Sequence, residues 1–415
     1  MPKPININAF TGMRNLEDAG DLFVKKGVVQ PRIVLNADVS DRGRLTKRDG
    51  QTKIISLSNG HSMFSGATCH LVMDGLTLKR ISGETATTIG TVTGPQSKMF
   101  YAEVGDLVYL SNRRYNGIFD PESNSLSDWG ITLPVGPVVS STDGNLPAGV
   151  YHVCFTAVSG DEISGNGPIS QIELSSEGGI SISNRPADCI VWCTEPNSDI
   201  LLRVGAADTI VHIPSVEPLP SLFCQPPPFM EHICHAFGRM WGAVGNFLYY
   251  SEPFHLGWFK MGANRFEFAA NITLIAKTYA GLFVGCEDRT YSLLGTQPEE
   301  MQQKDVGGGS IPGTLAYCND IIELGDTISP PEKKHHSVPV WVTENGIVAG
   351  NPVGRLFSLT QGKVRFAPGK EGAGLYRNKN GNFQYLTSFP KGGETDGMGI
   401  SDDATCTVIR NGKVI

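Results

Sequence analysis

Four side chains in one short segment are of the types that bind zinc. Cys224, His232, Cys234 and His235 all fall within twelve residues of one another. Structural zinc sites usually present two pairs of ligands, with the members of each pair two to five residues apart. Here Cys224 stands alone and the other three crowd one short stretch. The spacing therefore argues against a metal site.

Signatures of other chemistry are also missing. The stretch Gly307 to Ser310 is glycine-rich but lacks the Gly-Lys-Ser/Thr ending of a phosphate-binding loop. Neither a Gly-x-Ser-x-Gly nor a His-Glu-x-x-His motif occurs. A glycosidase would need two facing carboxylates, but the acidic residues stand in turn-like contexts, where the backbone alone favours Asp. The acidic residues in question are Asp74, Asp106, Asp161, Glu287 and Asp288. The sequence predicts no catalytic residues, no cofactor and no metal.

Basic side chains gather in the segment NADVSDRGRLTKRDG. It places Arg42, Arg44, Lys47 and Arg48 within seven positions. One interpretation is a solvated turn between two propeller strands, and another is a contact for an acidic partner or for DNA phosphate. Residues 1–60 carry ten Lys/Arg and six Asp/Glu, whereas the whole chain has a net charge of -7. A general nucleic-acid-binding surface would be basic, so this balance disfavours one.

The elements that position these residues are predicted to be β-hairpins. Turn residues such as Asp-Gly and Asn-Gly separate runs of β-branched and aromatic residues, which is the strongest short-range hairpin signal. Examples are TCHLVMDGLTLKRIS, KMFYAEVGDLVYLSN and RMWGAVGNFLYYSEP. The turns centre near residues 75, 105, 245, 287, 345, 380 and 411. Loosely spaced four-stranded units of this kind favour a β-propeller.

A gap between residues 112 and 236 interrupts the series with a different pattern. In GVYHVCFTAVSGDEISG, the apolar residues Tyr151, Val153, Phe155 and Ala157 alternate with more polar neighbours. Further short strands follow in IELSSEGGISIS, DCIVWCTEP and DILLRVGAADTIVHIP. This spacing predicts an immunoglobulin/fibronectin-like β-sandwich, with Trp192 as its core aromatic.

The predicted fold class is therefore all-β, a β-propeller-like domain with an inserted immunoglobulin/fibronectin-like β-sandwich. We expect an extended N-terminal arm over 1–35, a first propeller segment over 36–130, the inserted sandwich over 131–224 and a second propeller segment over 225–415. The nine cysteines are scattered without paired spacing, so we expect reduced, buried thiols. No run of about 18 apolar residues occurs and the N-terminus lacks a signal-peptide core, so a soluble, cytosolic chain is expected.

Several segments resemble the tail nozzle or tail-hub proteins of short-tailed bacteriophages, also described as packaged-DNA stabilisation proteins. The resemblance lies in NAFTGMRNLEDAGDLFV with NADVSDRGRLTKRDG, in FGRMWGAVGNFLYYSEPFHLGWF and in GLFVGCEDRTYSLLGTQPEEM. It also covers the GVYHVCFTAVSGDEISG strand pair, and thus spans most of the chain.

The resemblance implies a structural virion protein of the tail, synthesised in the host bacterial cytoplasm. It implies a homo-oligomeric ring, usually a hexamer, below the portal and a head–tail adaptor ring. Double-stranded DNA would pass through its bore and be retained after packaging, and tail fibres or spikes are possible further partners. Membrane insertion by this chain is not expected. Arg42, Arg44, Lys47 and Arg48 are the predicted interface residues.

Two other functions are compatible with the sequence. One is a carbohydrate-binding or receptor-binding propeller, for which exposed Trp258, Tyr249 and Tyr250 would be the mark. The other is a cytosolic propeller scaffold that binds other proteins.

Overall fold

Strands make up nearly all of the regular structure in the computed structural model of the chain. It describes residues 7–16, 23–25, 27–32, 34, 37–39, 42–47, 52–318, 337–360, 363–364, 368–379, 382–389, 405–410 and 413–414. A short 3-10 helix, η2, lies at Pro298–Glu300. Within these residues, no helix is long and apolar enough to cross a membrane. The chain divides into two compact units, one of residues 55–267 and one of residues 1–54 and 268–415.

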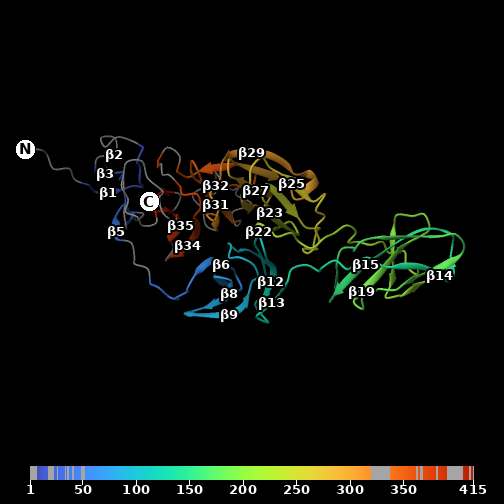
Figure 1. Ribbon diagram of the computed structural model, residues 1–415. Helices are drawn as coiled ribbons and strands as arrows, with labels where there is room; N and C mark the ends of the chain where they lie inside the picture. Colours follow the sequence, from blue (N-terminus) through green and yellow to red (C-terminus); the bar gives the residue numbers. More distant parts are fainter. Residues whose placement is uncertain are drawn as a thin grey trace, which may run out of the picture. The chain divides into compact units, whose positions relative to one another are not determined.

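The unit of residues 55–267 contains three four-stranded antiparallel sheets (Figure 1). Within each sheet, strands that are consecutive in the sequence are neighbours. The first sheet is β6 (Gly60–Ser65), β7 (His70–Asp74), β8 (Thr77–Ser82) and β9 (Thr85–Thr91). The second is β10 (Phe100–Val104), β11 (Leu107–Ser111), β12 (Asn116–Asp120) and β13 (Ser125–Asp128). The third is β22 (Glu231–Ala236), β23 (Arg239–Val244), β24 (Phe247–Tyr250) and β25 (Arg265–Glu267).

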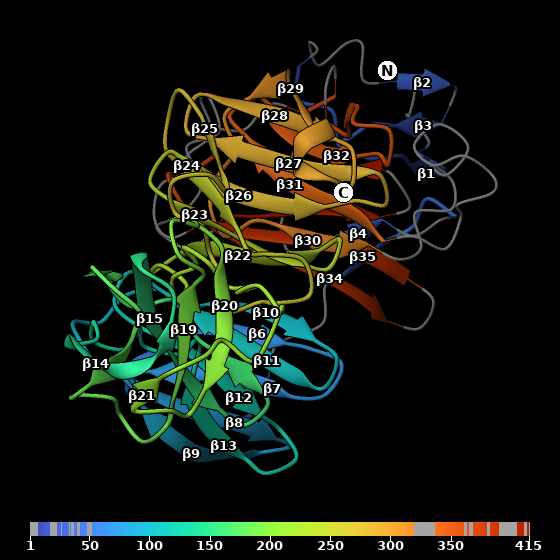
Figure 2. The ribbon, with the colours of Figure 1, turned by 90° about the vertical axis from the view of Figure 1, so that its right-hand side faces the viewer.

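The other unit contains three further sheets of the same kind (Figure 2). The first is β26 (Ile272–Lys277), β27 (Gly281–Cys286), β28 (Arg289–Leu294) and β29 (Gln302–Gly308). The second is β30 (Ala316–Cys318), β31 (Val338–Thr343), β32 (Gly346–Gly350) and β33 (Leu356–Ser358). The third is β34 (Ala373–Lys379), β35 (Asn382–Phe389), β36 (Thr405–Arg410) and β37 (Lys413–Val414). In the described part of each unit, three meandering four-stranded sheets are blades of a propeller-like fold, so the predicted all-β fold class is confirmed.

All seven predicted hairpins are present as antiparallel strand pairs. The pairs are β7–β8, β10–β11, β23–β24, β27–β28, β31–β32, β34–β35 and β36–β37. Gly75, Gly105 and Gly245 take φ values of 64°, 59° and 61° in their turns. Glycine adopts this left-handed region without steric cost, which is why these dipeptides predicted the turns.

Blades pack face to face inside each unit, and β31 shows how. Val340 and Val342 pack in a cluster with Tyr385 of the blade β34–β37, whereas Trp341 packs with Phe283 of the blade β26–β29. Successive side chains of a strand point to opposite faces. A strand covered on both faces is mostly apolar, which explains the run VPVWVT of β31, in which only Thr343 is polar.

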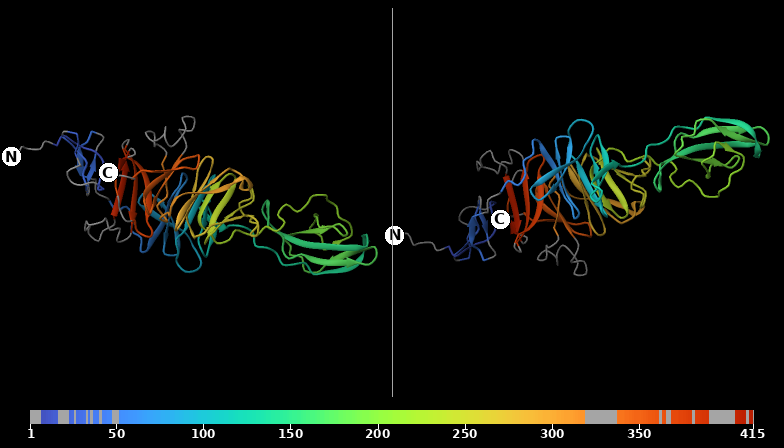
Figure 3. Two further views of the ribbon diagram at one scale, coloured as in Figure 1. Left: turned by 90° about the horizontal axis from the view of Figure 1, so that it is seen from above. Right: turned by 90° about the horizontal axis from the view of Figure 1, so that it is seen from below.

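The inserted region forms two sheets that pack against each other (Figure 3). One sheet is β14 (Val139–Leu146), β18 (Gly178–Ile182) and β21 (Thr209–Ile210). The other is β16 (Glu162–Ile163), β15 (Gly149–Ser159), β19 (Cys189–Thr194), β20 (Leu201–Gly205) and, paired with β15, β17 (Ser170–Leu174). Tyr151, Val153 and Phe155 lie in the core between the sheets with Ile180 and Ile210, as their alternation predicted.

Trp192 is buried in a core cluster of the inserted region, as predicted, but this cluster is not the one that contains Phe155. It pairs with Cys154 across β19 and β15, and antiparallel partners lie on the same face of a sheet. Both therefore point away from Phe155, into a second cluster with Leu219 on the outer face. The segment around Leu219 and the half-buried Leu222 folds back over this face. The Trp192 indole Nε1 donates to Thr156 Oγ1 at 2.9 Å.

The N-terminal region also differs from the prediction of an extended arm. Its described part contains a three-stranded sheet of β1 (Ala9–Phe10), β2 (Phe23–Lys25) and β3 (Val28–Val29). Strands β4 (Ala37–Val39) and β5 (Leu45–Lys47) form a separate hairpin, and the first blade begins at Gly60 rather than near residue 36. Strands of two or three residues carry too little apolar pattern to be recognised from periodicity.

Candidate interaction surfaces

The basic hairpin β4–β5 presents most of the predicted interface residues. Arg42, Arg44 and Lys47 are exposed, and Arg48 lies outside the described residues. Gly43, between the two arginines, is buried at φ 75° and accepts a hydrogen bond from Phe10 N at 2.8 Å. A Cβ at Gly43 would stand 2.6 Å from Ala9 Cβ. The turn is thus fixed to β1 while its cationic side chains face solvent.

The cysteine and histidine residues near position 230 are distributed over different surroundings. Cys224 is buried beside Gly165 of the sandwich, whereas Cys234 pairs with Trp241 in the blade β22–β25. The His232 ring packs on Phe100, with 4.4 Å between ring centroids. Burial, with the nearby charges of Lys98 and Arg113, lowers the pKa of His232 to about 3. Across the described ranges, no group of three or more His, Cys, Asp or Glu side chains could hold a metal ion.

Three of the turn carboxylates that were considered for glycosidase chemistry, Asp74, Glu287 and Asp288, bond to other residues of their own blades. Asp74 Oδ1 accepts from Asn59 N at 2.7 Å, and its Oδ2 contacts Lys79 Nζ at 2.7 Å. The hydrogen bond from Lys79 is the largest cause that lowers the pKa of Asp74. Glu287 accepts from Asn271, and Asp288 pairs with Arg289. The bonds of Asp74 and Glu287 tie the turn to the residue that precedes the first strand of the same blade.

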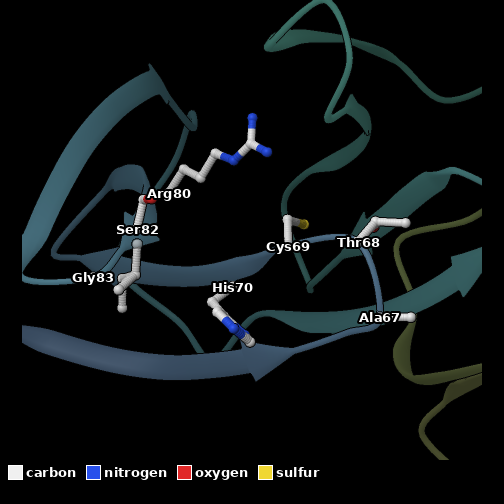
Figure 4. A pocket seen from close by; sticks show the side chains of 8 residues that line it. Ala67, Thr68, Cys69, His70, Arg80, Ser82 and Gly83 are labelled. Atoms are coloured by element: carbon white, nitrogen blue, oxygen red, sulfur yellow. The ribbon is translucent and has the colours of Figure 1, made fainter.

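A surface pocket of about 290 Å³ lies at one end of the blade β6–β9 (Figure 4). Residues with reactive side chains line it: Thr68, Cys69, His70, Arg80 and Ser82. Figure 4 shows Arg80 and Cys69 on one side of the sheet and His70 on the other, as the alternation of strand residues requires. Catalysis by a nucleophile needs a base within hydrogen-bond reach of it.

The side chains of the pocket have structural partners instead. His70 Nδ1 lies 3.0 Å from Ser65 Oγ, and the Arg80 guanidinium donates to Pro121 O at 2.9 Å in the next blade. Cys69 is buried, and desolvation is the largest cause that raises its pKa. Arg80 therefore links the blade β6–β9 to the next blade, and the buried Cys69 lies on the opposite side of the sheet from His70.

The sandwich and the blade β22–β25 are joined by a network of hydrogen bonds, which we call the junction. Trp258 Nε1 donates to Ile163 O at 2.7 Å. Ser221 Oγ donates to Ser164 O at 2.7 Å. Gln225 and Phe259 exchange backbone hydrogen bonds of 2.8 and 3.0 Å. The Trp258 bond joins the blade directly to the sandwich, while Ser221 and Gln225 hold the connecting segment to the sandwich and to the blade respectively.

Two exposed phenylalanines, Phe223 two residues after Ser221 and Phe254 four residues before Trp258, have an unfavourable backbone conformation. Phe223 is 66% exposed with φ 60°, and Phe254 is 86% exposed with φ 61°. Left-handed φ values are uncommon for residues other than glycine, and for a bulky one they indicate strain held by the surroundings. Phe223 N donates to Asn166 Oδ1 and Phe254 N to Gly238 O, each at 2.7 Å. The sequence patterns did not predict that these two phenylalanines are exposed. For Phe254, its position after Pro253 in a turn-like segment could have indicated exposure.

The aromatic residues that would mark a carbohydrate-binding surface are buried or stacked on another ring. Tyr249 and Tyr250 are each 8% exposed. The His255 ring stacks on Trp258 with 3.9 Å between centroids and 9° between planes. That stacking covers one face of the Trp258 indole, and the residue is half-buried.

Negative charge is concentrated on the sandwich. Residues 131–224 contain ten Asp/Glu and two Lys/Arg, which gives a net charge of -8 in a chain whose total is -7. All ten carboxylate residues are exposed. The two arginines, Arg185 and Arg203, already pair with Asp208 and Glu217. Counting charge by segment would have revealed this from the sequence.

Comparisons with known proteins give no family. No protein-family model and no curated protein matches the sequence. Among solved structures, BBS1N in complex with ARL6DN is 11% identical with a TM-score of 0.30, covering 80% of this chain and 89% of that one. Saccharomyces cerevisiae Sqt1 is 12% identical with a TM-score of 0.22, covering 72% and 100%. A prolyl endopeptidase is 9% identical with a TM-score of 0.29, covering 86% and 49%. Such scores relate the chain to none of the three, and the strand order itself establishes the fold.

Proposed function

We propose that the chain is a non-catalytic structural protein that binds other protein chains through its junction. The observation that carries this proposal is Phe254, a bulky apolar side chain 86% exposed in a left-handed conformation. Exposure of the ring and strain of the backbone both cost free energy. A protein partner that buries the ring would offset the first cost, and aromatic anchors commonly dominate protein interfaces.

The more specific form of the proposal is a subunit of a bacteriophage tail nozzle. The chain would form a homo-oligomeric ring, with six copies as the expected number, that contacts a head–tail adaptor ring and allows DNA to pass. Its support is the resemblance of the quoted segments and the acidic balance of the sandwich, since carboxylates do not bind DNA phosphate. In this form, the basic hairpin with Arg42, Arg44 and Lys47 contacts an acidic surface of a neighbouring chain.

Electron microscopy and mass measurement of the purified chain test the assembly. We expect discrete rings from the full chain, alone or with the adaptor protein, and reduced ring formation for Phe254→Ser. Phe229→Ser is the matched control, because Phe229 is 53% exposed in an ordinary backbone conformation. A chain that remains monomeric under all conditions would contradict the ring. Equal effects of the two substitutions would contradict the role of Phe254.

A further inference from the structure

The pocket at the end of the blade β6–β9 contains an arginine whose hydrogen-bonding capacity is only partly used. Arg80 is half-buried, and its Nη1 donates to Pro121 O at 2.9 Å and to Asn124 Oδ1 at 3.4 Å. Within the described part of the chain, Arg80 forms no other hydrogen bond and no ion pair. The donors on its Nε and Nη2 therefore remain available to a ligand.

The covalent geometry of the guanidinium determines where these available donors point. Nη1 lies on the same side of the Nε–Cζ bond as Cδ, whereas the Nε–H and Nη2 form the opposite edge. Because Pro121 and Asn124 of the β12–β13 turn hold Nη1, the opposite edge faces away from that turn. It faces the pocket that Arg80 lines together with Cys69 and Ser82 (Figure 4). Two parallel N–H groups on one edge match the two oxygens of a carboxylate.

The size of the pocket and a nearby hydroxyl also fit a small anionic group. Its volume of about 290 Å³ is near the lower limit of ligand pockets, so it suits a group of few atoms. Ser82 follows Arg80 by two residues in β8, and side chains two apart in a strand share a face. Ser82 is exposed, and its hydroxyl has no hydrogen-bond partner among the described residues. It can therefore donate to a ligand that Arg80 holds.

Glu103 limits the charge that a ligand of this pocket should carry. Its carboxylate accepts from Ala67 N and Thr68 N, each at 3.0 Å, and from Thr68 Oγ1 at 2.8 Å. Ala67 and Thr68 both line the pocket. Burial is the largest cause that raises the pKa of Cys69, and the Glu103 charge raises it further while the Arg80 charge lowers it. Since both charges act on the pocket, a ligand with one negative charge is favoured over a ligand with two.

We propose that this pocket is a carboxylate-binding site, in which the Nε–Nη2 edge of Arg80 holds both oxygens and the Ser82 hydroxyl donates to one of them. The bond from Nη1 to Pro121 O orients the guanidinium before the ligand binds. A small organic acid and an Asp or Glu side chain of a bound peptide both supply this group. The pocket shares no residue with the junction, so the proposal stands or falls separately from the proposed function.

The test is a titration of the full chain, followed by NMR on the arginine Nε–H signals and on the amide signal of Gly83, which lines the pocket. The probes are acetate and a blocked tripeptide with a single central glutamate, each at constant ionic strength near neutral pH. We expect a saturable shift of the Gly83 signal and of one Nε–H signal, which Arg80→Lys should remove. Binding of the peptide as tightly as acetate assigns the site to a polypeptide carboxylate, whereas binding of acetate alone assigns it to a small acid. The proposal is overturned if neither probe causes a saturable shift.

Three variants and a second anion locate the site and define its ligand, with the Gly83 signal as the readout. Arg80→Lys keeps the charge but loses the two-pronged edge, so acetate should bind about tenfold more weakly. Ser82→Ala removes one neutral donor and should weaken binding about threefold.

Arg114→Lys is the matched control, because Arg114 is exposed and does not line the pocket, and it should leave binding unchanged. Thermal melting verifies that each variant retains the fold. Sulfate, a dianion, should bind more weakly than acetate. The proposal is also overturned if Arg80→Lys binds acetate as the wild type does, if Arg114→Lys has an equal effect, or if sulfate binds more tightly than acetate.

Discussion

Strand β31 of a blade and strand β14 of the inserted sandwich differ in how they are covered. All six residues of β31 are buried, whereas β14 buries only Leu146 among its eight. Strand β31 lies between two other blades and packs Val340 toward one and Trp341 toward the other. Strand β14 belongs to a sheet with one face on the core and one face in solvent. The difference shows why β31 tolerates polar substitution at few positions and β14 at many.

The largest expected effect is a charge placed inside β31. Val340 is 0% exposed, and Ala316 and Ala349 are its cross-strand partners. Val340→Asp would bury a carboxylate among apolar neighbours, so we expect it to lower the free energy of unfolding by about 4 kcal/mol or more. Ser141→Asp in β14 should change it by about 0.5 kcal/mol or less, because Ser141 is exposed. Chemical denaturation of the full chain measures both, and similar costs at the two sites would contradict the comparison.

The two faces of strand pair β15–β19 give the next largest effects. Phe155 and Trp192 are 0% and 2% exposed, and truncation of either to Ala should cost about 3–5 kcal/mol. Their partners differ, because only Trp192 packs with Leu219. In double-mutant cycles with Leu219→Ala, we expect coupling for Trp192→Ala and additive costs for Phe155→Ala. Coupling of Leu219 to Phe155 would show that the covering segment acts on the core between the sheets.

Acid should weaken the blade β22–β25 through His232. The unfolded chain protonates this imidazole near a pKa of about 6.5, whereas the folded chain holds the pKa at about 3. Between these values the unfolded state binds more protons, so this contribution to stability falls as the pH falls. The expected slope is about 1.4 kcal/mol per pH unit within that window. His232→Asn keeps a residue that tolerates the φ of 52° and should flatten the slope. An unchanged slope would mean that His232 is not the group that titrates.

The seven hairpins and the alternation of β15 were predictable from the sequence because both signals are local. A two-residue turn such as Gly105-Asp106 sets its own geometry, and a period of two identifies one face of a strand. The side on which Trp192 packs was not predictable, because Leu219 reaches it from a segment 27 residues away. The left-handed conformation of Phe254 was not predicted for a similar reason, because its backbone N–H bonds to Gly238, 16 residues earlier. Local patterns determine strands and turns, whereas surfaces arise from segments that meet only in the folded chain.

The smallest expected effects come from single charges of the sandwich, and their signs should differ. Asp208 pairs with Arg185 at 2.7 Å but is 68% exposed, so Asp208→Asn should destabilise by about 0.5 kcal/mol or less. Asp143 on β14 is exposed and forms no ion pair with a described residue. Since residues 131–224 carry a net charge of -8, Asp143→Asn relieves repulsion and should stabilise slightly at low ionic strength. Salt shortens the range of both interactions, so both differences should shrink toward zero at high ionic strength. Thermal melting at low and high salt checks this, and a stabilisation by Asp143→Asn that persists in high salt would require a local cause rather than the charge of the whole sandwich.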